Sequence, residues 1–240
     1  SMADKYRQIN HYLEVFSHLA EQSGWLEKPA EKELVLADMG CGKAYLTFAT
    51  WHWFNRIRKR PARLLGVESR AELVAKTAEL AANIQAFNLE FVSGTIATAM
   101  LPPLDGLIAL HACDTATDEA ILRGIELNAK LILVAPCCQK ELRPQFGSPA
   151  PFAGVLRHGV MEERMAEWVT DGLRALYLEW AGYETKIFEF VSDEHTPKNL
   201  MISAIQKTKP FSNPASRKKI VELKEYFGIQ HHALDGLLAT

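Results

Sequence analysis

The stretch that decides the fold reads LVLADMGCGKAYL and runs from Leu34 to Leu46. It begins as a short apolar run and becomes polar at Asp38, just before two closely spaced glycines. Short continuous apolar runs are typical of strands buried on both faces of a parallel sheet. Glycines let the backbone turn tightly and approach a ligand closely, and the start of a following helix presents N–H groups to that ligand. We therefore expect a strand, a ligand-binding turn and a helix.

The same alternation of apolar runs and helical patterns continues along the chain. The alternation of strand and helix patterns predicts a doubly wound, Rossmann-like α/β sheet of seven strands with right-handed crossovers. Only a short turn-rich segment separates the last two strands, which predicts a hairpin, so the sheet is mostly parallel with an antiparallel last strand. The expected strands are 34–37, 63–67, 89–92, 104–110, 130–134, 185–190 and 200–205, and the expected helices are 3–24, 44–58, 70–86, 115–127, 158–181 and 215–227.

Composition sets the broad class of protein. The 240 residues are 48% hydrophobic and 23% charged, which is ordinary for a globular domain. A membrane-spanning run of 18 apolar residues and a secretory signal are both absent from the sequence pattern. Four cysteines do not make a disulfide framework, so we expect reduced thiols and a cytoplasmic location. The net charge of −2 argues against a broadly basic surface, although it leaves a local basic patch open.

We expect three parts along the chain. Residues 1–29 form an N-terminal cover helix, residues 30–207 form the main domain, and residues 208–240 form a linker and a helical tail. The prolines at positions 210 and 214 mark the linker.

The details of the glycine turn separate several nucleotide-binding families. A dinucleotide fingerprint needs a third glycine, but Tyr45 stands at that position. The phosphate loop of the NTPases is also absent. The sequence instead has an acid, Asp38, two residues before Gly40, and a second acid, Glu68, at the end of the next expected strand.

This arrangement of D-x-G-x-G and a second acid resembles the first two motifs of the class I S-adenosylmethionine (SAM) methyltransferases. The resemblance covers residues 30–206 and implies SAM as the cofactor. It implies that the glycine turn cradles the methionine part and that Glu68 accepts hydrogen bonds from both ribose hydroxyls. Ala44 stands where the family has a third glycine. The adenine contacts are expected just after the third strand.

Two further motifs resemble one branch of that family. LHACDTATD spans Leu110 to Asp118, and a C-C pair, Cys137 and Cys138, follows the fifth strand. The branch includes acceptor-stem tRNA ribose methyltransferases and other methyltransferase-like proteins. In the tRNA enzymes histidines follow the C-C pair, whereas Gln139 follows it here. The resemblance implies RNA as the acceptor, with tRNA first. A small-molecule or protein acceptor, and a noncatalytic SAM-binding module, remain alternatives.

Methyl transfer requires an aligned nucleophile and, where that nucleophile carries a proton, a group to receive it. Ligands of open α/β sheets lie beyond the carboxyl ends of the strands, so we expect His111 and Asp114 to be catalytic. Asp118 fits the start of the next helix. We predict no metal site, because adjacent cysteines in extended backbone point to opposite faces. The residues expected to bind the cofactor are Asp38, Gly40, Cys41, Gly42, Glu68, Ser93, Gly94, Thr95 and His111.

Overall fold

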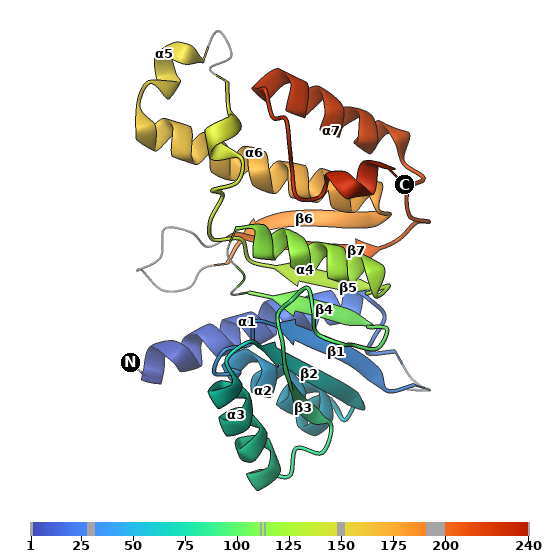
Figure 1. Ribbon diagram of the computed structural model, residues 1–240. Coiled ribbons are helices and arrows are strands. Elements are labelled where there is room, and N and C mark those ends of the chain that lie inside the picture. The colour runs from blue at the N-terminus through green and yellow to red at the C-terminus, as the bar shows by residue number, and fades with distance from the viewer. Residues whose placement is uncertain are drawn as a thin grey trace.

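The chain folds around one seven-stranded sheet, which a computed structural model describes over residues 2–27, 32–110, 112, 114–147, 152–190 and 200–239 (Figure 1). The strand order is β3-β2-β1-β4-β5-β7-β6. Only β7 runs against its neighbours, pairing antiparallel with both β5 and β6, so the expected fold class is confirmed. The strands are β1 (Leu34–Met39), β2 (Ala62–Glu68), β3 (Leu89–Ser93), β4 (Gly106–Ala109), β5 (Leu131–Val134), β6 (Tyr183–Glu189) and β7 (Leu200–Gln206).

The helices form where the apolar spacing predicts them. The second one widens into a π-helix over its last six residues, and the sequence did not predict three short helical elements, α5, η2 and η3. The helical elements are α1 (Met2–Gln22), α2 (Tyr45–His52), η1 (Trp53–Arg58), α3 (Ala71–Asn83), α4 (Thr115–Glu126), η2 (Arg143–Gln145), α5 (Ala153–Leu156), α6 (Gly159–Trp180), α7 (Pro214–Phe227) and η3 (Asp235–Ala239).

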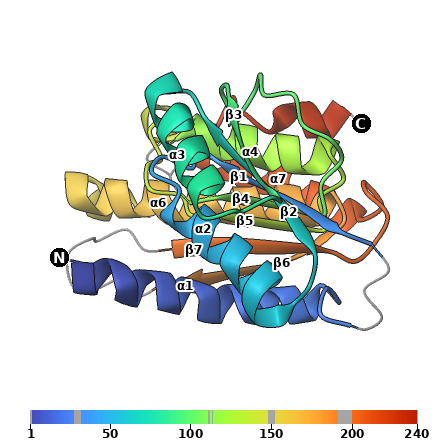
Figure 2. The ribbon, with the colours of Figure 1, turned by 90° about the horizontal axis from the view of Figure 1, so that it is seen from below.

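Two hydrophobic cores cover the two faces of the sheet. Figure 2 shows α1 and α2 on one side of the strands, and α4 and α7 on the other. The first core is rich in aromatic side chains: the ring of Phe16 from α1 contacts those of Trp25, Trp53 and Phe54. The second core joins the sheet to α4, α6 and α7. All residues of β4 and β5 are buried, as a strand covered on both faces requires.

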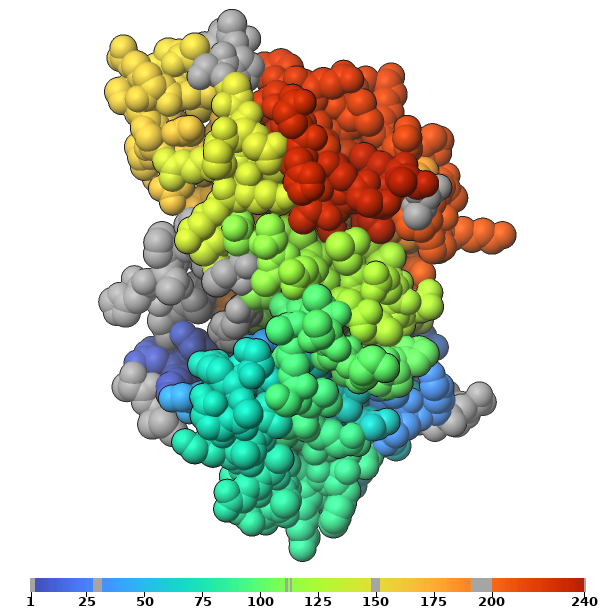
Figure 3. Space-filling model, viewed as in Figure 1, coloured from blue at the N-terminus to red at the C-terminus, as the bar shows by residue number. Residues whose placement is uncertain are grey.

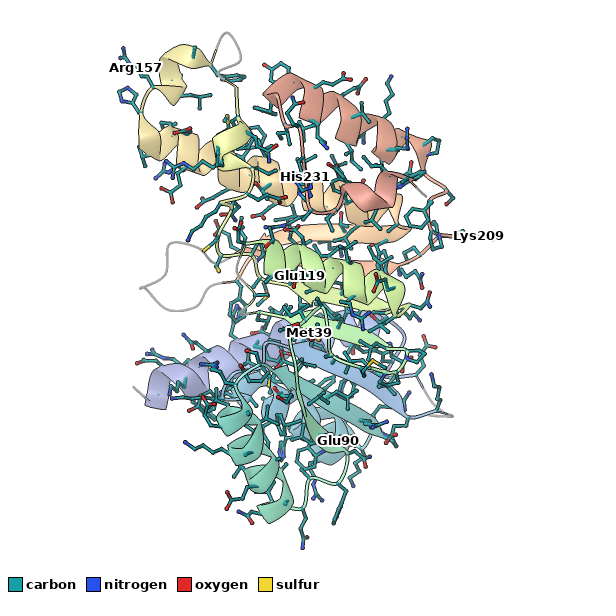
Figure 4. All side chains as sticks on the ribbon, in the orientation of Figure 1. Met39, Glu90, Glu119, Arg157, Lys209 and His231 are labelled. Carbon is teal, nitrogen blue, oxygen red and sulfur yellow. The ribbon has the colours of Figure 1, made fainter. Side chains whose placement is uncertain are left out.

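The last residues of the chain belong to the second core. Leu234 and Leu237 are buried there, and the indole N–H of Trp180 donates a hydrogen bond to the carbonyl oxygen of Leu237 at 2.9 Å. His231, which lies below α7 in Figure 4, is 3.1 Å from Glu141 through its Nδ1 atom. The C-terminal segment therefore contacts the chain that follows β5.

The carboxyl ends of the parallel strands share one edge of the sheet, on the left in Figure 1. The first residues of α1 reach the same edge. A projection made of α5 and the start of α6 stands above it, with Arg157 at its outer end (Figures 3 and 4). In the part of the chain that the structure describes, no helix is long and apolar enough to cross a membrane.

Candidate functional site

The glycine turn joins β1 to α2 with a positive φ angle at every second residue, at Gly40, Gly42 and Ala44. Gly40 has φ +74° and Gly42 has φ +56°, and the intervening turn is fastened to β2 because the N–H groups of Gly40 and Cys41 both donate to the Val67 carbonyl at 2.9 Å. Ala44 also has a positive φ of 58°, at the position of the third family glycine. An alanine tolerates this left-handed conformation at a cost of roughly 1 kcal/mol, so the turn keeps its shape without the third glycine.

The space beside Gly40 suits a ligand. A Cβ atom built at this position would meet no heavy atom within 4 Å, so the backbone faces open space. At Gly42 the corresponding Cβ would lie 3.7 Å from Arg70 Nη2 and 4.0 Å from Glu68 Oε2. The bare backbone of the turn therefore leaves room for a cofactor between Gly40 and the Glu68 carboxylate.

Asp38 closes β1 just below the turn. Its Oδ2 atom accepts a hydrogen bond from the Thr47 hydroxyl at 2.5 Å. One turn further along the same face of α2, the Thr50 hydroxyl is 2.8 Å from the Tyr12 hydroxyl of α1. The first contact fixes α2 against the end of β1 and the second fixes it against α1, so the carboxylate of Asp38 has a defined position.

Glu68 ends β2 and is only 5% exposed. Its Oε2 atom accepts a hydrogen bond from the Gly42 N–H at 2.9 Å, and its Oε1 atom accepts one from the Arg70 N–H at 3.0 Å. The Arg70 guanidinium, the largest cause, lowers the pKa of Glu68 to about 2 despite the opposing effect of burial. Glu68 is therefore an anion at neutral pH, as an acceptor for two ribose hydroxyls must be.

The segment after β3 lies next to Glu68. Ser93 is paired with Glu68 in the sheet, and the Gly94 N–H donates to the Glu68 carbonyl at 3.1 Å. The hydroxyl of Thr95 is 2.8 Å from that of Thr98, which closes a short turn. The structure thus brings the residues expected at the adenine beside the residue expected at the ribose.

Cys41 lies inside this site but remains a thiol. Burial, followed by the negative charges of Asp38 and Glu68, raises the pKa of the Cys41 thiol well above its ordinary value. Its side chain is 6% exposed. Cys41 therefore contributes packing and backbone to the turn rather than a thiolate.

The expected catalytic groups follow β4. His111 and Cys113 lie outside the described residues, so the placement of His111 stays a prediction. Asp114 is described: its Oδ1 atom accepts hydrogen bonds from the N–H groups of Lys140, at 2.8 Å, and Glu141, at 3.2 Å. The carboxylate thus connects the loop after β4 to the loop after β5. A general base requires an accessible lone pair, and one oxygen of Asp114 is already used twice.

Sequence reasoning missed a buried ionic cluster behind this loop. Asp118 is fully buried and receives two hydrogen bonds from Arg174 of α6, at 2.8 Å and 2.7 Å. Arg174 also contacts Asp171 at 3.0 Å, and Gln139 donates to Asp171 at 3.3 Å. The only available signal was the spacing of Asp171 and Arg174, three positions apart within an otherwise apolar helix face. Arg70 was missed as well, although it lies two residues from Glu68.

The cysteine pair does not form a metal centre with the described residues. The sulfur atoms of Cys137 and Cys138 are 3.8 Å apart. Within the described ranges, no three histidine, cysteine or acidic residues come together in a way that could hold an ion. That description leaves out His111 and Cys113, so the absence of a metal stays a prediction.

Residues 4–145 match a protein family described as a methyltransferase domain. Because this match covers more than half of the chain, the protein belongs to that family. It is a methyltransferase, and S-adenosylmethionine is its methyl donor. A comparison with curated protein sequences finds no match.

Solved structures with a similar fold come from diverse enzymes. An rRNA methylase from Streptococcus thermophilus is 11% identical, with a TM-score of 0.46, and the match covers 78% of this chain and 95% of that one. A dimethyladenosine transferase from Plasmodium falciparum is 14% identical, with a TM-score of 0.46 and coverage of 92% and 73%. The protein WbdD is 16% identical, with a TM-score of 0.49 and coverage of 86% and 43%.

Proposed function

We propose that the protein methylates RNA, with tRNA as the first candidate acceptor. The observation that carries this proposal is the placement of two exposed lysines. Lys43 lies in the turn after β1 and Lys140 in the loop after β5, and β4 lies between these strands in the sheet. An acceptor presented at the end of β4 passes between two cations, which suits a phosphate backbone. The resemblance of residues 110–118 and of the C-C pair to tRNA ribose methyltransferases supports the same substrate.

The cofactor-binding half of the proposal assigns each part of SAM to residues at the strand ends. When bound, SAM supplies an electrophilic methyl group on a sulfonium. The turn from Gly40 to Gly42 would hold the methionine part, and Asp38 would support that turn. Glu68 would accept hydrogen bonds from the ribose hydroxyls, and the segment from Ser93 to Thr95 would lie along the adenine.

The catalytic half concerns the loop after β4. Methyl transfer forms one bond to the acceptor as the carbon–sulfur bond breaks, so the acceptor atom must be aligned with that bond. We assign to His111 the proton that a protonated acceptor loses in this step. Asp114, whose Oδ1 atom holds two backbone N–H groups, shapes the loop that presents His111.

The test is a parallel labelling experiment. The protein is incubated with tritiated SAM and either total RNA or an RNase-treated lysate, and Glu68→Ala serves as the control that lacks the ribose acceptor. We expect label in RNA, concentrated in the tRNA fraction, and a strong loss of label with the control variant.

Two outcomes would overturn the RNA proposal. Label that appears only in the RNase-treated lysate would identify a small-molecule or protein acceptor. Calorimetric binding of SAM without transfer to either preparation would favour the noncatalytic module.

A further inference from the structure

Arg174 carries a buried charge in a part of the chain beyond the family match, which ends at residue 145. Its side chain is 1% exposed and belongs to α6. The guanidinium makes a two-pronged contact with Asp118 and a third contact with Asp171. Buried ion pairs are weak contributors to net stability, because desolvation offsets their attraction. The cluster therefore calls for another explanation than stability alone.

The fourth contact of Arg174 explains its position. Its Nη2 atom also donates to the backbone carbonyl of Asp114 at 3.0 Å. Asp114 has φ 55° and ψ −127°, a conformation that non-glycine residues rarely adopt. Strained backbone of this kind persists only where surrounding contacts determine it, and it concentrates at functional sites. Arg174 supplies one of those contacts from α6, which packs on the same face of the sheet as α4.

Asp114, the strained residue, also holds the loop after β5 in place. The carboxylate of Asp114 accepts the N–H groups of Lys140 and Glu141. The adjacent Gln139, only 7% exposed, donates to Asp171, which itself contacts Arg174. Two separate routes therefore lead from Arg174 to the loop that carries Lys140.

We propose that Arg174 is a positioning residue for methyl transfer. It fixes the strained conformation of Asp114, and with Asp171 it holds the loops after β4 and β5 at one distance from each other. These loops carry the expected base, His111, and the rim cation, Lys140. The role does not depend on which acceptor is methylated, although it rests on the proposed placement of the acceptor at the end of β4.

The test measures hydrogen exchange in the two loops. Arg174→Lys keeps the charge but cannot contact Asp118 twice and reach Asp114 at the same time. We expect amide exchange in residues 110–118 and 137–141 to quicken by at least about tenfold, with little change in β1 and β2. Arg164→Lys, an exposed arginine on the same helix, is the matched control and should leave exchange unchanged. Calorimetry should show SAM affinity within about threefold of the wild type.

A second variant guards against the loss of the fold. Asp114→Gly adopts the same backbone angles without strain and leaves the contacts of Arg174 with Asp118 and Asp171 in place. It removes only the carboxylate, so exchange should quicken at the amides of Lys140 and Glu141. Unchanged loop exchange in both variants would overturn the proposal. So would a uniform increase over the whole chain in Arg174→Lys, because that result indicates general destabilisation. If loop exchange quickens as expected in both variants but the protein labels no RNA, the proposed substrate alone is wrong and the positioning role stands.

Discussion

Glu68 and Arg70 hold each other through two side-chain hydrogen bonds, from Nε to Oε1 at 3.0 Å and from Nη2 to Oε2 at 3.1 Å. Both carboxylate oxygens that are expected to receive the ribose hydroxyls thus face a guanidinium in the protein alone. The Arg70 side chain is 59% exposed, so it can leave Glu68 for solvent at little cost. If Glu68 accepts the ribose hydroxyls as we propose, cofactor binding exchanges one set of partners of Glu68 for another.

Replacing the charge of Glu68 should weaken cofactor binding. Glu68→Gln keeps the shape but loses the charge and one acceptor oxygen, and charge-assisted hydrogen bonds are worth roughly 1.5–3 kcal/mol each. We expect SAM affinity to fall by about 2–3 kcal/mol, or roughly 30–150-fold, in calorimetry. An unchanged affinity would show that Glu68 does not contact the ribose.

Removing Arg70 should have the opposite effect. Arg70→Ala frees Glu68 from its competitor. Because the Arg70 side chain is 59% exposed, its contact with the buried Glu68 should contribute at most about 1 kcal/mol, so SAM affinity should rise by no more than about fivefold. Arg63→Ala removes another two-pronged arginine–carboxylate pair, with Glu90, away from the glycine turn, and is the control. A marked fall in affinity for Arg70→Ala alone would mean that Arg70 contacts the cofactor.

The buried cluster should make stability depend on pH. Burial raises the pKa of Asp171 to about 6 from an ordinary 3.8, although Arg174 and Gln139 oppose the shift. The folded protein therefore binds this proton more tightly than the unfolded chain. This tighter binding stabilises the folded state. The stabilisation is complete below pH 3.8 and is lost as the pH rises through about 6.

The variant Asp171→Asn isolates this contribution, because it cannot titrate. In urea unfolding, raising the pH from 5 to 8 should lower the unfolding free energy of the wild type by on the order of 1 kcal/mol more than it lowers that of the variant. If the wild type and Asp171→Asn differ in unfolding free energy by the same amount at both pH values, the raised pKa of Asp171 is contradicted.

Two substitutions at Asp114 separate positioning from proton transfer. Asp114→Asn retains an oxygen that accepts the N–H groups of Lys140 and Glu141, so turnover should fall by less than about tenfold. Asp114→Ala retains neither acceptor and should lose considerably more. Turnover measured with tritiated SAM distinguishes the two roles. If turnover of Asp114→Asn falls by about 100-fold or more, Asp114 is the base.

Lys140 should contribute to RNA affinity in a salt-dependent way. Each phosphate contact adds about 0.7 to the slope of log affinity against log salt for single strands and about 0.9 for duplexes. Lys140→Gln should lower this slope by about one contact in filter binding with total tRNA. Lys209→Gln is the control, since Lys209 is exposed and lies on the far side of the molecule from the strand ends (Figure 4). Equal salt slopes for the two variants would show that Lys140 does not contact a phosphate of the RNA.

The sequence predicted those features that depend on local pattern. The strands were recognisable because β4 and β5 are apolar on both faces, and the turn was recognisable because Gly40 and Gly42 follow an acid within a few residues. The partners of Arg174 were not predictable, because Asp118 lies far away in the sequence and a buried ion pair needs the fold to bring its members together. The strained backbone of Asp114 was hidden for the same reason, since no glycine marks it.

The position of β7 has a consequence for synthesis on the ribosome. Its strand begins at Leu200, yet it pairs with β5, which ends at Val134. Until that late strand leaves the exit tunnel, the apolar residues of β5 form an open sheet edge, and such edges recruit other nascent chains. The helix α6 is made earlier and packs on one face of the sheet, so only β7 closes this edge. We therefore expect a translational pause between the synthesis of β5 and that of β7 to leave the nascent chain prone to aggregation.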